Sequence, residues 1–211
     1  MTLRYKRPRK AVAELSARDP RFARLVELAG PPNIPVRPST FETIARAITY
    51  QQLSGAAAGT IWGRVLDTMG GELRPDEVLR RRDTTLRKAG LSAAKTRSIK
   101  DLARHVVDGR LEPESLDSLD DDDVVEHLTQ VKGIGPWSAH MHLIFSLGRM
   151  DVWPVGDLGV RVGLQKFRGD LNAPTDKQAL PMGDAYAPYR SILAWYMWRI
   201  HDVEDWSRDD G

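Results

Sequence analysis

The part of the sequence best suited to bind an anion is a glycine turn between two predicted helices. It reads Val-Lys-Gly-Ile-Gly-Pro-Trp and runs from Val131 to Trp137. Glycine lets the backbone adopt a positive φ and approach a partner closely. The next helix begins at once, so its free N–H groups and its dipole point at the turn, which suits a phosphate. A monovalent cation sharing the turn carbonyls is also compatible. A plain helix connection has the same pattern, and the short motif alone favours that simpler interpretation.

The second candidate group is the carboxylate of Asp157, which directly precedes another predicted helix. The helix dipole there favours the ionised form. Such a carboxylate can stabilise a positive charge that develops in a transition state, and it can orient or deprotonate an attacking water. Aspartate is also a common helix N-cap, and for Asp157 considered alone the cap is the favoured interpretation.

The elements that would position these groups are almost all predicted to be helices. Ser39 and Glu42 form a capping-box pattern, and the apolar residues that follow recur at helical spacing. No convincing alternating strand, repeat or low-complexity tract is present. Short helices with brief connections predict an all-α fold of about nine or ten helices. The predicted helices cover roughly 41–48, 55–69, 75–79, a short segment ending at Gly90, 94–107, 121–129, 136–147, 158–165 and 188–198.

Composition excludes several classes of protein. The 211 residues contain no cysteine, which excludes a cysteine-ligated zinc or iron–sulfur cluster. No apolar run is long enough for a membrane helix, and no apolar segment follows the basic start, so we expect a cytoplasmic protein. The formal net charge is only +2, so nucleic-acid binding would need a local basic face.

Two basic segments are candidates for such a face. One is the N-terminal run that includes Lys6, Arg7, Arg9 and Lys10, for which a solvated tail is the favoured interpretation. The other comprises Lys95, Arg97 and Lys100, and phosphate contact and a solvated helix face fit it equally well. His140 and His142 are two positions apart on a helix, which is a poor metal-binding pair, so we expect no catalytic metal.

Three blocks of the chain resemble the helix–hairpin–helix DNA glycosylase superfamily, in particular its 3-methyladenine DNA glycosylase II type. The first is the hairpin, with an aspartate at a set interval after it; here Asp157 follows Gly135 by 22 positions. The second is Gln-Gln-Leu-Ser at 51–54, followed by alanines, and the third is Pro-Tyr-Arg-Ser at 188–191, leading into aromatic residues. Together the blocks span about residues 40 to 200.

The resemblance implies that Asp157 is catalytic and that the enzyme is monofunctional. Bifunctional members carry a lysine just after the Gly-x-Gly-x unit, where it attacks the sugar and the strand is nicked. This chain has Trp137 there, and indole is not a nucleophile. The expected reaction is hydrolysis of the N-glycosidic bond of flipped alkylated purines, of the 3-methyladenine and 7-methylguanine class, in base excision repair. A bifunctional glycosylase/AP lyase and a non-catalytic helix–hairpin–helix DNA-binding protein are the alternatives.

The resemblance also assigns the remaining site residues. Trp137, Trp198 and Met141 would line the base pocket, where aromatic faces attract a cationic alkylated base. Met141 departs from the tyrosine of the related enzyme, which leaves the substrate range open. Gln52 or Leu53 would be the wedge that fills the gap in the duplex. The phosphate-binding hairpin would comprise Lys132, Gly133, Ile134 and Gly135. We expect Trp62 and Trp195 to belong to the core.

The expected architecture is a helix–hairpin–helix glycosylase fold with two helical lobes flanking a DNA-binding cleft. One lobe, a six-helix unit with the hairpin, would span residues 41–148. The other would combine residues 1–40 with 149–211. We expect no counterpart of the additional N-terminal α/β domain of the related enzyme. We expect no cofactor other than a possible monovalent cation at the hairpin, double-stranded damaged DNA as the partner, and a monomer.

Overall fold

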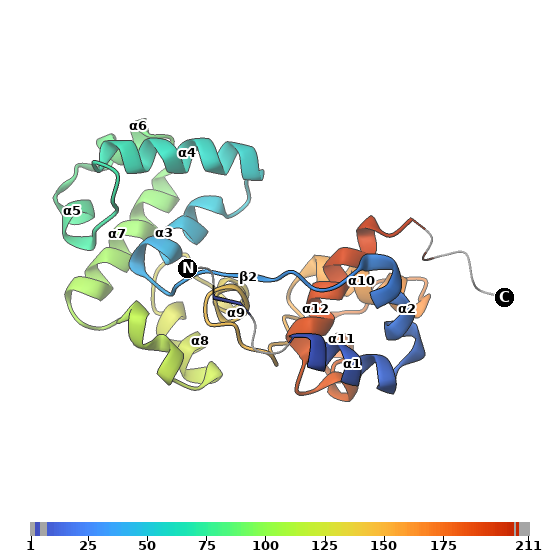
Figure 1. The fold of residues 1–211 in the computed structure, drawn as a ribbon. Helices are drawn as coiled ribbons and strands as arrows, with labels where there is room; N and C mark the ends of the chain where they lie inside the picture. The colour runs from blue at the N-terminus through green and yellow to red at the C-terminus, as the bar shows by residue number, and fades with distance from the viewer. Residues whose placement is uncertain (1–2, 5–7, 205, 207–211) are drawn as a thin grey trace. The chain divides into compact units, whose positions relative to one another are not determined.

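The computed structural model describes residues 3–4, 8–204 and 206, and these form two compact units. One unit combines Met1–Val36 with Leu143–Gly211, and the other comprises Arg37–His142. Among the described residues there are twelve α-helices and three short 3-10 helices (Figure 1). The prediction of an all-α fold is confirmed. Of the basic N-terminal run, Lys6 and Arg7 lie outside the described residues, whereas Arg9 and Lys10 belong to helix α1.

The unit Arg37–His142 is built around a long central helix, α7 (Ala93–Val107). Helix α7 packs against α3, α5 and α6, and it buries Ile99, Leu102 and Ala103 completely. Serine side chains cap the N-termini of α4 and α7. The other elements are α3 (Phe41–Tyr50), α4 (Gly55–Thr68), α5 (Pro75–Arg80), α6 (Asp83–Lys88), η1 (Pro113–Ser118), α8 (Asp121–Thr129) and α9 (Pro136–Phe145), the last of which continues into the other unit.

The predicted capping box at Ser39 is wrong by one residue. Thr40 is the N-cap of α3, and its hydroxyl accepts a hydrogen bond from the Thr43 N–H at 3.1 Å. Ser39 instead donates its hydroxyl to the Pro113 carbonyl and lies 2.9 Å from Nε2 of the buried His142. The neighbouring threonine supplies the same kind of cap, so the helix still begins where the sequence pattern indicated.

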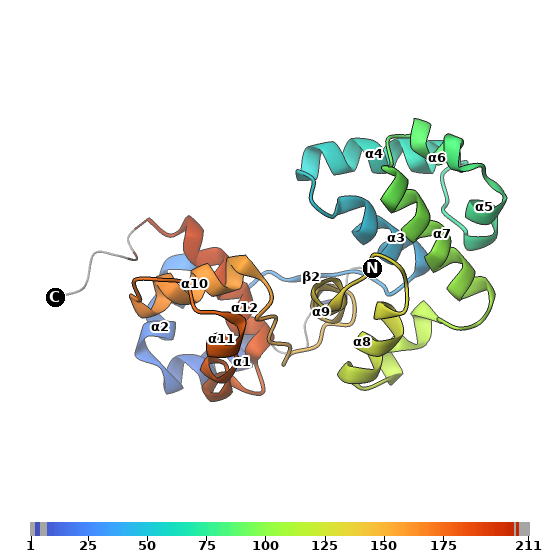
Figure 2. The ribbon, with the colours of Figure 1, turned by 180° about the vertical axis from the view of Figure 1, so that it is seen from behind.

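The other unit packs its helices around α12 (Arg190–Arg199). Helix α12 contacts α10 (Leu158–Arg168), α2 (Pro20–Ala29) and α1 (Pro8–Arg18), and Figure 2 shows α10 and α12 side by side from behind. Helices α10 and α12 cross closely at Gly163, where glycine has no Cβ. A Cβ at this position would overlap the Met197 carbonyl. The remaining elements are α11 (Asp176–Met182), η2 (Asp184–Tyr186) and η3 (Ile200–Asp202).

Three helices of this unit, α1, α2 and α11, and one pair of strands were not predicted from the sequence. Leu3–Arg4 (β1) pairs antiparallel with Pro35–Val36 (β2), and Leu3 lies opposite Val36. Strands of two residues are too short to show an alternating pattern. Among the described residues, the structure has no helix with the length and apolar character needed to cross a membrane.

Candidate active site

The glycine turn joins the end of α8 to the start of α9 and is anchored by two buried apolar side chains. Val131 and Ile134 are buried, and the Ile134 N–H donates to the Val131 carbonyl at 3.1 Å. Lys132 and Gly133 between them are exposed. The two buried side chains therefore hold the turn on the unit, and the exposed pair between them leaves its tip accessible to a partner.

Gly133 is required at the tip for two reasons that lie within the chain itself. Its φ is +83°, a conformation that L side chains rarely adopt, and a Cβ there would overlap Ser98 Oγ on α7. Gly135 is different, because its φ is not positive and a Cβ would meet nothing within 4 Å. No contact within the described residues therefore explains the glycine at position 135.

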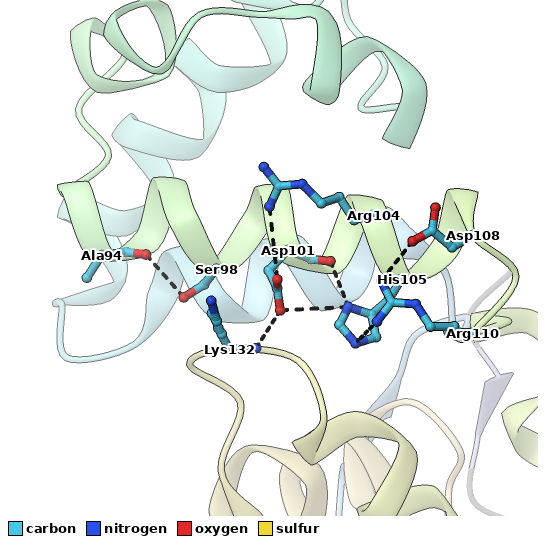
Figure 3. Close-up of polar contacts among 8 residues, drawn as sticks. All are labelled: Ala94, Ser98, Asp101, Arg104, His105, Asp108, Arg110 and Lys132. Atoms are coloured by element: carbon cyan, nitrogen blue, oxygen red, sulfur yellow. Dashed lines mark hydrogen bonds and ion pairs between the residues drawn. The ribbon is translucent and has the colours of Figure 1, made fainter.

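Helix α7 holds the hairpin through a carboxylate (Figure 3). Asp101 Oδ2 accepts a hydrogen bond from the Lys132 backbone N–H at 2.9 Å, and Arg104 and His105 lie beside the same carboxylate. Arg110 donates to His105 Nε2 at 2.8 Å, which leaves Nδ1 of that ring as the donor toward Asp101. The hairpin is thus joined to the central helix of its unit by a charge-assisted hydrogen bond.

The turn between α3 and α4 carries both predicted wedge residues, Gln52 and Leu53. Both are exposed, and Leu53 has 41% of its surface accessible although it is a large apolar side chain. Gln52 has a φ of +55°, and no other non-glycine residue in the described part of the chain has a positive φ. Such a conformation is sparsely populated for a residue with a Cβ and often marks a functional position.

The two lysines of the basic stretch on α7 make contacts that neither sequence interpretation anticipated. Lys95 donates to the carbonyls of Thr49 and Gln51, and burial lowers the pKa of its ammonium group. Lys100 donates to the Arg81 carbonyl at 2.7 Å and pairs with Asp83. Both ammonium groups are therefore engaged within their own unit.

Asp157 in the other unit is the N-cap of α10, and two donors converge on one of its oxygens. Its Oδ1 accepts from the Val160 N–H at 2.9 Å and from the Trp198 indole N–H at 2.9 Å. The predicted capping role is confirmed. Gly159 favours the close approach of Trp198, because a Cβ there would lie 3.1 Å from both Asp157 Oδ1 and Trp198 Cδ1, which is tighter than ordinary van der Waals contact.

Hydrogen bonds hold the first residues of the loop that leads to Asp157. Arg190 forms two hydrogen bonds of 2.8 Å with the two oxygens of Asp151, and this contact raises the pKa of the guanidinium. The hydroxyl of Ser191 accepts from the Val152 N–H, and the indole of Trp153 donates to the Ala179 carbonyl. These bonds tie the loop to α12 and α11, so Asp157 is presented by a rigid segment.

The predicted pocket aromatics fall into the two units. Trp198 is partly buried in the Asp157 unit and stacks on Phe145, with ring centroids 5.8 Å apart. Trp137 and Met141 lie on α9 in the hairpin unit, where Trp137 has 45% of its surface accessible.

The two expected core tryptophans differ. Trp62 is buried as predicted, whereas Trp195 is only partly buried, with its ring edge-on to Tyr196 and beneath Arg199. Within the residues that the structure describes, no group of three or more His, Cys, Asp or Glu side chains is placed to hold a metal ion.

Comparison with known proteins identifies the family of this chain. The model of the HhH-GPD superfamily base excision DNA repair protein matches residues 45–181. DNA-3-methyladenine glycosylase 1 of Schizosaccharomyces pombe is 34% identical over 205 residues, which cover 94% of this chain and 90% of that protein.

Two solved structures are similar over nearly the whole chain. The Schizosaccharomyces pombe 3-methyladenine DNA glycosylase Mag1, in complex with abasic DNA, has a TM-score of 0.83 at 34% identity and covers 93% of this chain and 98% of Mag1. A DNA-3-methyladenine glycosidase from Bacillus halodurans has a TM-score of 0.83 at 37% identity, covering 93% and 92% of the two chains. These matches, together with the hairpin and the capped aspartate, show that the chain belongs to the HhH-GPD superfamily of base excision DNA repair proteins.

Proposed function

We propose that this protein is a monofunctional DNA glycosylase that releases alkylated purines from double-stranded DNA in base excision repair. The observation that carries the proposal is the pair formed by Asp157 and Trp198, in which two N–H donors fix one carboxylate oxygen at the start of α10. It is supported by the relatives, which are named for 3-methyladenine, and by the Mag1 structure, which contains abasic DNA.

In this mechanism Asp157 stabilises the positive charge that develops on the deoxyribose. The bond between C1′ and the base nitrogen breaks, the electron pair leaves with the base, and water adds at C1′. Asp157 orients that water and accepts its proton. Because the donors already hold the carboxylate, it does not need to reorganise as the charge appears. The products are a free base and an abasic site in an intact strand.

Strand cleavage is not part of the proposed reaction. A lyase needs an amine that attacks the sugar and forms a Schiff base. At the position that follows the Gly-x-Gly-x unit this chain carries Trp137, whose indole cannot perform that step. We assign Trp137, Met141 and Trp198 to recognition of the base, because indole faces would attract a cationic base by roughly 0.5 to 2 kcal/mol.

The hairpin residues Lys132, Gly133, Ile134 and Gly135 would bind the DNA backbone. The absence of any internal reason for Gly135 supports this role, because the missing Cβ lets a phosphate approach the backbone. The turn carbonyls are also suited to a monovalent cation: the Val131 carbonyl accepts the Ile134 N–H, the Gly133 carbonyl accepts the Gln51 Nε2–H, and a carbonyl oxygen has two lone pairs. Gln52 or Leu53 would fill the gap left by the flipped base, and the protein would act as a monomer.

The deciding experiment is incubation with methylated duplex DNA, followed by analysis of released bases and of strand breaks before and after alkali. We expect free 3-methyladenine or 7-methylguanine, with breaks only after alkali. Breaks before alkali would favour a bifunctional enzyme. No base release under any condition would favour a DNA-binding protein without catalysis.

The same assay on Asp157→Asn separates catalysis from capping. Asparagine is as good an N-cap as aspartate, so the variant should fold and bind DNA but lose base release. Asp19 is a matched control, because it caps α2 in the same unit by accepting from the Arg21 N–H. Asp19→Asn should keep its activity. Base release retained by Asp157→Asn would refute the catalytic assignment.

A further inference from the structure

We propose that Lys95 and Gln51 are positioning residues that hold the wedge turn, residues 51–54, in a set geometry against the hairpin. This inference rests on the proposed function, in which the wedge turn enters the duplex when the base flips. The sequence motif assigns no role to Gln51, and the basic stretch that includes Lys95 indicates only a phosphate contact or a solvated helix face. Both lie in the same compact unit as the turn and the hairpin.

Lys95 holds the main chain at the start of the wedge turn. Its Nζ donates to the Thr49 carbonyl at 2.7 Å and to the Gln51 carbonyl at 2.8 Å. These are carbonyls at the C-terminal end of α3, where the helix dipole favours a positive charge. The next residue is Gln52, whose φ of +55° persists only if its surroundings restrain it. The lysine supplies that restraint from the first turn of α7.

The side chain of Gln51 connects the wedge turn to the hairpin. Its Nε2 donates to the Gly133 carbonyl at 3.0 Å and lies 3.2 Å from Ser138 Oγ on α9. The main chain of Gln51 is therefore held by Lys95 while its side chain holds the tip of the hairpin. A continuous series of hydrogen bonds joins the element that would fill the gap to the element that would bind the phosphate.

One face of α7 supports both turns. Lys95, Ser98 and Asp101 are spaced by three residues, so they lie along one side of the helix. Ser98 lies against Gly133, and Asp101 accepts from the Lys132 N–H. Each charged group meets backbone groups of the opposite polarity: the ammonium meets carbonyls and the carboxylate meets an N–H. This arrangement fixes the distance between the two turns.

The test compares binding to two duplexes that differ at one position, one undamaged and one with a stable tetrahydrofuran abasic analogue. The wedge acts only where there is a gap, so the ratio of the two dissociation constants reports its placement. A partly unfolded protein weakens both affinities equally and leaves the ratio unchanged. We expect Lys95→Met, which removes charge-assisted hydrogen bonds, to reduce the preference for the abasic duplex by about tenfold. Gln51→Met removes hydrogen bonds between neutral groups and should reduce the preference by about three- to tenfold.

Two further variants complete the test. Lys95→Arg keeps the charge near the carbonyls and should retain most of the preference. Lys100→Met is the matched control, because Lys100 is on the same helix and also donates to a backbone carbonyl, that of Arg81, outside the wedge turn. Its ratio should equal that of the wild type.

An unchanged ratio in both Lys95→Met and Gln51→Met, with wild-type excision intact, would overturn the positioning role and leave the proposed function standing. If Lys95→Met does not fold, Gln51→Met decides by the same criterion. A wild-type protein that neither prefers the abasic duplex nor releases methylated bases overturns the proposed function, and this inference with it.

Discussion

The substitution Gly163→Ala should separate Asp157 from its indole donor without changing either residue. A Cβ at position 163 would overlap the Met197 carbonyl oxygen and lie 2.7 Å from the carbonyl carbon and 2.8 Å from Cα. Carbon atoms in contact need ~3.5 Å, so α12 must move away from α10 by about 1 Å. These are backbone atoms, which cannot rotate aside as the end of a side chain could.

The expected cost has a stability part and an activity part. Overpacking of this kind lowers the free energy of unfolding by roughly 1 to 3 kcal/mol, whereas replacing glycine by alanine in a helix raises it by roughly 0.5 to 1 kcal/mol. The free energy of unfolding should therefore fall by about 1 kcal/mol, with an upper limit of about 2.5 kcal/mol. Trp198 directly follows Met197, so its hydrogen bond to Asp157, now 2.9 Å, would lengthen beyond bonding distance. Loss of a charge-assisted bond of roughly 1.5 to 3 kcal/mol predicts about 10- to 100-fold slower excision.

The assay combines urea unfolding with single-turnover excision at a temperature where the variant is fully folded. Gly63→Ala is the control, since Gly63 lies within α4 and a Cβ there meets nothing within 4 Å. It should stabilise the protein by up to roughly 1 kcal/mol and leave excision unchanged. If Gly163→Ala unfolds at the wild-type urea concentration and excises at the wild-type rate, the close crossing of α10 and α12 does not determine the geometry at Asp157.

Three other changes test separate parts of the structure. Trp198→Phe removes the N–H that reaches Asp157 but keeps an aromatic ring, so excision should fall about tenfold with little change in unfolding, as measured by kinetics and urea titration. Burial lowers the pKa of His142 from 6.5 to about 4. As the pH falls below 6.5, this histidine is protonated in the unfolded state but not in the folded state, so the free energy of unfolding decreases. Between pH 7.5 and pH 5 the loss is about 2 kcal/mol, and it should be absent in His142→Gln; equal pH profiles for the two proteins would contradict this. Gly133→Ala introduces a strained φ and a clash with Ser98, so duplex affinity in a salt titration should fall at every salt concentration; wild-type affinity would show that the turn adapts.

Local patterns in the sequence predict the elements that carry the site, and they fail where the pattern is short or interrupted. The turn at Gly133 and the cap at Asp157 were predictable because both depend on neighbouring residues. Helix α11 contains Pro181, which disrupts the expected periodicity. Helix α2 was missed although Asp19, Pro20 and Gly30 supply its cap, its first position and its end. Those signals were sufficient to find it.

The contacts that arrange the site could not be predicted, because they join distant parts of the chain. Trp198 and Asp157 are 41 positions apart, and Lys95 and Thr49 are 46 apart. Which lysine of a basic stretch faces inward depends on how α7 packs, and no periodicity contains that information. The same packing places the Lys95 ammonium group against the carbonyls of a turn instead of in solvent.

The capping and catalytic interpretations of Asp157 are not competing explanations in this structure. A carboxylate that must stabilise a developing cation has to be held in place, and two N–H donors hold one Asp157 oxygen at the start of α10. The Val160 N–H that makes Asp157 a cap also holds the oxygen on which Trp198 converges. The sequence signal was ambiguous because the structural contact is the means by which the proposed chemistry is prepared. Substitution by asparagine therefore separates the two roles, since it keeps the acceptor that caps the helix and removes only the charge.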